Sequence, residues 1–230
     1  MASGGGLSNR LGCSGYVGWR AVVCGVPAGY SGPWLSETWG RGGRFGIAPT
    51  GGDRTYWYAS ANLPSGAMDD PVTRQQQLLD RFAEWHRPIA QLIARTPPAD
   101  ILFTPIHDRA PEFRLTGARR ELADRCIFLG DAAHPLTPNL GQGACLAMED
   151  AAELAAVLPV ELHDLTRLRA AWAEYTGKRQ RRARAIWRVS RWVGRLVQCE
   201  QPVLCHLRDG WMAATPGWVH DQATRWIFRP

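Results

Sequence analysis

The chain has 230 residues, of which 45% are hydrophobic and 21% charged, so it is expected to fold around a sizeable core, and disordered and fibrous classes are excluded. Its 27 Lys and Arg against 21 Asp and Glu give a formal net charge of +6, which makes nucleic acid and anionic surfaces possible partners. No apolar run has the length of a membrane span, and the first residues lack the apolar core of a signal peptide. We therefore expect a cytoplasmic protein without a membrane span.

Residues 15–61 predict a mainly antiparallel sheet, because aromatic and β-branched segments alternate there with short turns. These segments are GYVGWRAVV, LSETWGR, GRFGIAPT and RTYWYASA. Apolar residues at helical spacing between Asp69 and Ile93 predict an amphipathic helix that covers one face of the sheet and is broken or ends near Pro88. The segment ILFTPIHDR then reads as a further strand of the same sheet.

The composition changes near residue 118, where a strand, a loop and a helix of α/β type are predicted. The strand is expected at Arg125–Gly130, and the helix follows Gly143 and stops at Pro159. A second helix is expected over Thr166–Gln198. The fold class is therefore α/β (α+β), with a flexible leader at 1–14, a substrate-type sheet and helix at 15–117, and a second domain at 118–230.

The six cysteines include no C-x-x-C pair and none at zinc-ligand spacing with a histidine. We expect reduced and mostly buried thiols, and no metal site.

Residues 130–151, GDAAHPLTPNLGQGACLAMEDA, carry the strongest chemical signal. Asp131 follows an apolar segment at the edge where open α/β sheets bind ligands, and its carboxylate can accept hydrogen bonds from a polyol. Gly141 and Gly143 allow a ligand to approach the backbone, and the free amides of the following helix favour an anion or an electron-rich carbonyl. An isolated G-x-G could equally be a helix entry, with Asp131 as a capping residue.

The whole string resembles the third FAD motif of the group A flavoprotein monooxygenases, the para-hydroxybenzoate hydroxylase-like family. The resemblance implies that Asp131 binds the ribityl chain of FAD and that residues at the helix entry line the isoalloxazine ring. The cofactor-binding residues implied are Gly130, Asp131, Pro138, Asn139, Gly141, Gln142, Gly143, Ala144 and Cys145. No residue is assigned as catalytic. His134, Glu149 and Asp150 are interpreted as structural, the two carboxylates pairing with arginines or with the preceding loop.

The earlier segments resemble the substrate sheet of the branch that contains urate hydroxylases and zeaxanthin epoxidase-like enzymes. In that branch an arginine and a tyrosine on neighbouring strands face the substrate, and Arg44 and Tyr56 match these positions. A guanidinium can hold a carboxylate or ring carbonyl, and a phenol can orient a polar ring. Both residues could equally be ordinary cross-strand residues of a sheet.

A complete member of the family also has an N-terminal G-x-G-x-x-G unit that binds the FAD pyrophosphate, and GGGLSN at residues 4–9 does not match it. The resemblance therefore covers the C-terminal portion of the family. On this basis we expect poor flavin affinity in the isolated chain. The missing half could come from a separate chain, a split gene or a late start assignment.

The resemblance implies an FAD-dependent monooxygenase that uses NAD(P)H as co-substrate and molecular oxygen. It would hydroxylate or epoxidise an aromatic or electron-rich alkene substrate through a flavin hydroperoxide. The alternative is a non-catalytic remnant, or a partner-binding module that retains the sheet. Nucleic-acid binding rests only on the arginine excess, most of which lies at residues 166–198, and we interpret that helix as packed on one face and solvated on the other.

Overall fold

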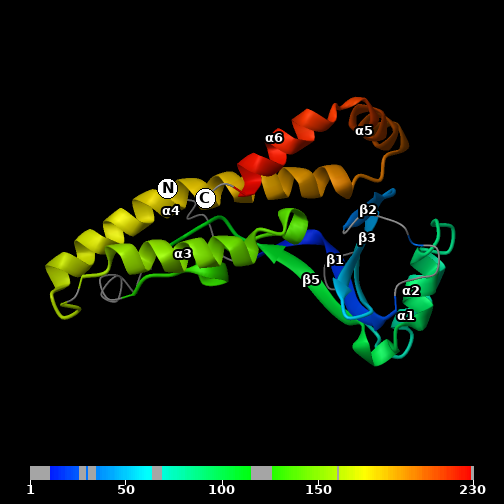
Figure 1. The fold of residues 1–230 in the computed structure, drawn as a ribbon, viewed down its shortest axis with the longest axis horizontal. Helices are drawn as coiled ribbons and strands as arrows, with labels where there is room; N and C mark the ends of the chain where they lie inside the picture. Colours follow the sequence, from blue (N-terminus) through cyan, green and yellow to red (C-terminus); the bar gives the residue numbers. More distant parts are fainter. Residues whose placement is uncertain are drawn as a thin grey trace, which may run out of the picture. The chain divides into compact units, whose positions relative to one another are not determined.

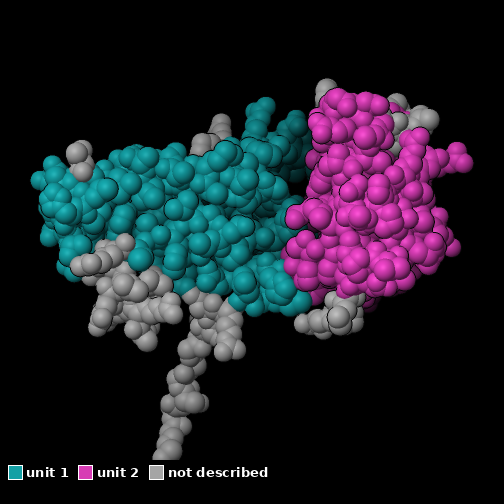
Figure 2. Space-filling view, turned by 90° about the horizontal axis from the view of Figure 1, so that it is seen from below, with its two compact units in different colours: residues 1–14, 107–194, 213–230 teal, residues 15–106, 195–212 magenta. Residues whose placement is uncertain are grey.

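In the computed structural model, residues 11–25, 30, 35–63, 69–114, 126–159 and 161–228 are described. They form two compact units, unit 1 (residues 1–14, 107–194 and 213–230) and unit 2 (residues 15–106 and 195–212) (Figure 2). The sequence placed a domain boundary at 117/118, which lies outside the described residues. In the structure, residues 107–114 already belong to unit 1, and residues 195–212 return to unit 2.

Unit 2 is built on a five-stranded sheet with the strand order β2-β3-β4-β1-β5 (Figure 1). Its strands are β1 (Gly12–Cys24), β2 (Ser36–Trp39), β3 (Gly43–Gly51), β4 (Arg54–Asn62) and β5 (Leu102–Asp108). The pairs β1–β4, β2–β3 and β3–β4 are antiparallel. The β3–β4 turn has positive φ at Gly51, Gly52 and Asp53, a backbone conformation that glycine adopts without strain. The strands predicted within residues 15–61 and in the segment ILFTPIHDR are thus confirmed.

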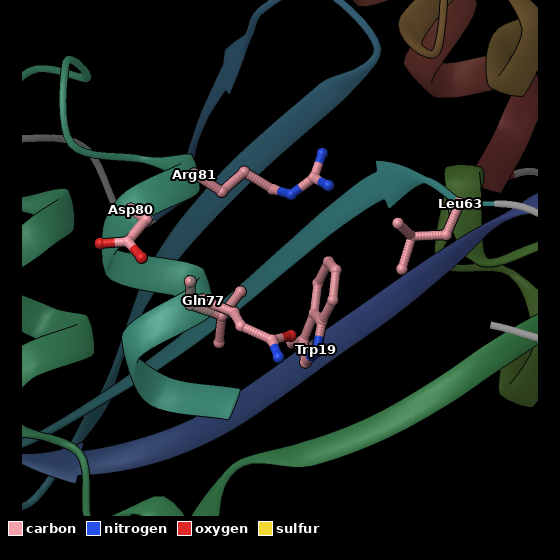
Figure 3. Close-up of a pocket in the computed structure, with 6 residues that line it drawn as sticks. Trp19, Leu63, Gln77, Asp80 and Arg81 are labelled. Carbon is pink, nitrogen blue, oxygen red and sulfur yellow. The ribbon is translucent and has the colours of Figure 1, made fainter. Parts of the chain in front are cut away.

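One face of the sheet packs against the helices α1 (Arg74–Arg81) and α2 (Ile89–Arg95) (Figure 1). Trp57 is fully buried in this core, stacks on Phe45 at a centroid distance of 5.3 Å, and donates a hydrogen bond from Nε1 to Thr96 Oγ1 at 2.9 Å. The amphipathic helix expected between residues 69 and 93 therefore exists as two helices separated near Pro88. On this side a groove of about 450 Å³ lies beside Trp19, Leu63 and Arg81, whose side chain extends away from α1 (Figure 3).

The opposite face of the sheet is called the outer face here. Since side chains alternate along a strand, the residues between the core positions of β1, β3 and β4 point to this face. In register, Arg44 lies opposite Ser60, Tyr58 opposite Arg20, and Tyr56 opposite Val22. The outer face therefore brings together Arg20, Arg44, Tyr56 and Tyr58.

Unit 1 contains α3 (Gly143–Val157), the first part of α4 (Leu165–Val197), and α6 (Gly217–Phe228). Helix α5 (Pro202–Ala214) lies almost entirely in unit 2. Tyr175 of α4 is fully buried and meets Phe113 edge-on at a centroid distance of 5.6 Å. Helices α3 and α4 match the two helices expected from the sequence. Among the described residues, none of the helices combines the length and apolar character needed to cross a membrane.

Three expectations differ from the structure. A strand was predicted at Arg125–Gly130, but residues 126–129 do not form one. The Phe128 amide donates a hydrogen bond to Phe113 O at 2.9 Å, and no described strand pairs with this segment. The leader at 1–14 lies largely outside the described residues, but Gly12–Ser14 already belong to β1. The thiols are free, yet only Cys205 is buried, because Cys13 and Cys24 lie near the ends of β1, where strands are open to solvent.

Candidate functional site

The loop before α3 places a carboxylate beside a helix start. Gly130 opens the short helix η3 (Gly130–Ala132) with a φ of 55°, which lets the chain turn sharply there. Asp131 follows and is exposed, and it makes no hydrogen bond or ion pair with any residue that the structure describes. A Cβ on Gly143 would lie 4.0 Å from Asp131 Oδ1, so this carboxylate lies beside the first residue of α3.

The amino end of α3 is open. Pro138–Leu140 form a 3₁₀ turn (η4), Gly141 has a φ of 64°, and Gln142 precedes the helix without capping it through its side chain. The first amides of α3 therefore lack helical acceptors and carry the positive end of the helix dipole. The Gln142 side chain is buried, and both its Nε2 and its Oε1 lack a partner among the described residues.

A buried charge network connects this loop to α3 and α4. Asp150 of α3 is fully buried; its Oδ2 lies 2.6 Å from His134 Nε2 and accepts a hydrogen bond from the Gly130 amide at 2.9 Å. Its Oδ1 accepts from Arg179 Nε of α4 at 2.7 Å. Burial alone would raise the pKa of Asp150, but the hydrogen bonds from His134, Arg179 and Gly130 together hold it below its usual range.

The network continues to Glu149, which pairs with Arg179 Nη1 at 2.7 Å and with Arg182 Nη2 at 3.4 Å. Arg182 also donates to the carbonyl of Ile227 at 2.7 Å. The expectation that His134, Glu149 and Asp150 are structural agrees with these contacts, since each has an ion-pair partner in unit 1, while the buried Nδ1 of His134 has no hydrogen-bond partner among the described residues.

The other predicted flavin residues lie on the same loop and helix start. Asn139 donates from Nδ2 to Thr137 Oγ1 at 2.9 Å and to Ser190 O at 2.8 Å, so its side chain fastens the loop to α4. Pro138, Gly141 and Ala144 are exposed, and Cys145 is half-buried. The structure thus brings all nine predicted cofactor residues together in one part of unit 1.

The two predicted substrate residues lie on the outer face in unit 2, in different surroundings. Arg44 is only 3% exposed; its Nη1 lies 3.4 Å from Glu37 Oε1, and its Nε donates to Ser60 Oγ at 3.3 Å. Tyr56 is half-buried, with its ring centroid 5.9 Å from that of Tyr58. Burial raises the pKa of Tyr56, and the charge of Arg20 partly opposes this rise.

Sequence reasoning missed the cluster around Glu37. This carboxylate accepts hydrogen bonds from Tyr58 Oη and Trp39 Nε1 as well as from Arg44. Burial and the neighbouring Glu37 carboxylate raise the pKa of Tyr58, so this phenol stays protonated and can only donate to Glu37. The sequence carries no signal for this cluster, which follows from the strand register, because Glu37 and Tyr58 both face Gly46 across the sheet.

The profile of the family described as "FAD binding domain" matches residues 41–190, which include strands β3 and β4 and the loop of Asp131. The chain belongs to this family. The resemblance to the group A flavoprotein monooxygenases is thereby confirmed.

Curated relatives include the aurachin C monooxygenase/isomerase of Stigmatella aurantiaca, 44% identical over 92% of this chain and 52% of the relative. The FAD-dependent urate hydroxylase of Klebsiella pneumoniae is 36% identical over 75% of this chain and 42% of the relative. The chain thus spans about half the length of the curated relatives it matches.

Among solved structures, Klebsiella pneumoniae HpxO complexed with FAD and uric acid superposes with a TM-score of 0.81 at 29% identity, covering 95% of this chain and 54% of that chain. A salicylate hydroxylase substrate complex, with a TM-score of 0.66 at 20% identity, shares the fold.

The residues of the loop fit the flavin that the family binds. A ribityl chain offers hydroxyl donors, and Asp131 offers an exposed acceptor that no described residue occupies. The ring offers electron-rich atoms near N1 and the C2 carbonyl, and the uncapped start of α3 offers amides. The buried, unpartnered amide of Gln142 adds one further donor and acceptor at the same end of α3.

Proposed function

We propose that this chain is the substrate-sheet and closing-helix part of an FAD-dependent, NAD(P)H-using monooxygenase that acts on an aromatic or electron-rich small molecule. The observation that carries the proposal is that Asp131, an exposed carboxylate without a partner among the described residues, lies beside Gly143 at the uncapped amino end of α3. This arrangement is complementary to a polyol joined to an electron-rich ring. The relatives named as monooxygenases and hydroxylases support the same reaction class.

Flavin bound in this loop and reduced by NAD(P)H would supply the activation of molecular oxygen. The chain's own contribution is to bind, orient and tune. Asp131 would hold the ribityl chain, and the amides at the start of α3 would stabilise negative charge on the ring by about 0.3–1 kcal/mol. The buried network of Asp150, His134 and Arg179 would keep the loop in shape while the ring charge changes.

The outer face of unit 2 would hold the substrate, with Tyr56 as a hydrogen-bonding group. Complete relatives are about twice as long, and this sequence contains no G-x-G-x-x-G turn. We therefore propose that turnover needs an additional segment or chain that binds the FAD pyrophosphate.

The test uses two flavins that differ only in the polyol. Riboflavin carries the ribityl chain and lumiflavin does not, so we expect the chain to bind riboflavin more tightly, measured by quenching of flavin fluorescence. In Asp131→Ala this preference should fall about tenfold, the value of one charge-assisted hydrogen bond. Asp221→Ala removes an exposed carboxylate on α6 and should leave the preference intact. Equal binding of both flavins by the unaltered chain, or an unchanged preference in Asp131→Ala, contradicts the proposal.

A further inference from the structure

The outer face carries a second cation that the family pattern does not single out. Arg20 of β1 lies opposite Tyr58 of β4. Strand β3 pairs with the other side of β4, so Arg20 and β3 flank Tyr58 on opposite sides. Arg20 is exposed and makes no hydrogen bond or ion pair with any residue that the structure describes. Its charge acts on Tyr56, whose pKa it lowers against the effect of burial.

Arg44 is in the opposite situation. Its guanidinium is nearly fully buried and lies against the carboxylate of Glu37 and the hydroxyl of Ser60. Ser60 is fixed in turn, because its Oγ accepts a hydrogen bond from Gln198 Nε2 at 2.6 Å. The positive charge of Arg44 is therefore compensated inside unit 2, and turning the guanidinium toward a ligand would leave Glu37 without its cation. Separating a buried ion pair is costly, so Arg44 is poorly suited to meet an anion.

Arg20 also lines a groove. This groove, of about 410 Å³, is bounded by Arg20, Val22, Tyr56, Asp100 and Leu102 together with two alanines. Val22, Leu102 and the Tyr56 ring give it apolar walls, and Arg20 and Asp100 place one charge of each sign at its rim. Arg20 and Asp100 form no ion pair with each other, so both charges remain available to a ligand. All of these residues belong to unit 2.

We infer that Arg20, and not Arg44, is the cation that selects the substrate, and that the groove takes a flat ring bearing an ionised oxygen. Arg44 is then a positioning residue, which holds Glu37 and through it the phenol of Tyr58. The oxyanion would accept from the Arg20 guanidinium, the ring would lie between Val22, Leu102 and Tyr56, and Asp100 would disfavour a second negative group. That the bound ring is then oxidised rests on the proposed function. That the groove binds an anionic ring through Arg20 does not depend on it.

The test measures ligand binding alone, without flavin. Its result can therefore be interpreted even if the proposed function is wrong. The probes are salicylate and its neutral amide, salicylamide, which differ by one charge and little in shape. Ligand-observed NMR titrations at low ionic strength should show tighter binding of salicylate, and the preference should shrink with added salt, as expected for an exposed cation. In Arg20→Gln the preference should fall about five- to tenfold.

Two further variants sharpen the result. Arg81→Gln removes another exposed arginine, which lines the separate groove on the α1 side of the same sheet (Figure 3). This variant should not change the preference for salicylate. Asp100→Asn should raise the affinity for salicylate more than that for salicylamide. Arg44→Lys keeps the charge beside Glu37 and should keep the preference.

The inference is overturned if the unaltered chain shows no preference for salicylate, or if Arg20→Gln weakens both probes equally. It is also overturned if Arg44→Lys abolishes the preference while Arg20→Gln retains it. A riboflavin preference in the same protein, measured separately, reports on the proposed function irrespective of these outcomes.

Discussion

His134 Nε2 and Asp150 Oδ2 lie 2.6 Å apart, and both side chains are completely shielded from solvent. Because an ionised carboxylate only accepts hydrogen bonds, the proton between them belongs to His134 Nε2. The Gly130 amide shares the same oxygen, so the pair fixes the residue that begins the loop of Asp131. The loop geometry therefore depends on a buried contact between the loop and α3.

Removing the carboxylate should destabilise the protein strongly. Asp150→Asn removes the charge that meets Arg179 Nε and leaves Arg179 paired with Glu149 alone, so we expect a loss of about 3 kcal/mol of the free energy of unfolding, the lower end of the range for breaking a buried ion pair. His134→Ala should cost less, about 1–3 kcal/mol, because Arg179 and Gly130 keep their acceptor. Urea unfolding followed by circular dichroism measures both. Asp221→Asn on exposed α6 serves as control, and an Asp150→Asn midpoint equal to that of the control would contradict this assignment.

The same carboxylate predicts a pH dependence. The pKa of Asp150 in the folded state lies below its ordinary value, so the unfolded chain binds its proton more readily. Its contribution to stability is therefore complete above about pH 5 and is lost as the pH falls through about 3.9 and then through the lower folded value. Denaturation midpoints measured between these values should fall with decreasing pH, and less steeply in Asp150→Asn. If the midpoints of the unaltered chain and of Asp150→Asn fall equally steeply with decreasing pH, other carboxylates cause the acid sensitivity.

Gly46 should be intolerant of any side chain. A Cβ at this position would lie 2.1 Å from Tyr58 Cζ, so the phenol must leave Glu37 or the strands must shift. We expect Gly46→Ala to cost about 1–3 kcal/mol, measured by urea unfolding. The cost should disappear when Gly46→Ala is made in a Tyr58→Ala background, as a double-mutant cycle can show.

Gly18→Ala is the matched control for Gly46→Ala. It also faces outward from the sheet, but its Cβ would find its nearest atom, Ile106 Cδ1, at an ordinary contact distance of 3.6 Å. If Gly18→Ala and Gly46→Ala are equally destabilising, general loss of glycine rather than the Tyr58 contact explains the effect.

Gly141 tests the backbone of the loop. Its φ of 64° is left-handed, while no atom lies within 4 Å of an added Cβ, so strain rather than a clash decides the outcome. Asn tolerates this conformation and β-branched residues do not. Gly141→Asn should preserve stability and riboflavin binding, whereas Gly141→Val should lose about 1–3 kcal/mol and weaken riboflavin. Equal behaviour of the two variants would show that the left-handed turn at Gly141 is dispensable.

The sheet and the long helices could be predicted from the sequence, because alternation and helical spacing are local signals. The strand Arg54–Asn62 reads directly from RTYWYASAN. Glu149 and Asp150 were expected to pair with arginines or with the preceding loop, and the structure shows both kinds of contact. The strand expected near Cys126 was wrong, since an apolar segment becomes a strand only when a neighbour pairs with it.

The surroundings of the site could not be predicted in the same way. Arg44 matches a motif, but its burial against Glu37 depends on the β2–β3 register, which the sequence leaves open. Arg20 has no motif at all, and its interest comes from the absence of a partner among the described residues. The buried, unpaired amide of Gln142 likewise emerges only when the whole loop is folded.

The chain passes between the two units at residues 14/15, 106/107, 194/195 and 212/213, so neither unit is a continuous stretch of sequence. A fragment that ends after β5 would lack Gln198, which holds Ser60, and Cys199, whose carbonyl accepts from the Gly42 amide at 2.8 Å. The sheet of unit 2 is therefore completed by residues synthesised after the whole loop of Asp131. Sheet and loop cannot be separated by a single cut, because the boundaries between the units fall within β1, β5, α4 and α5.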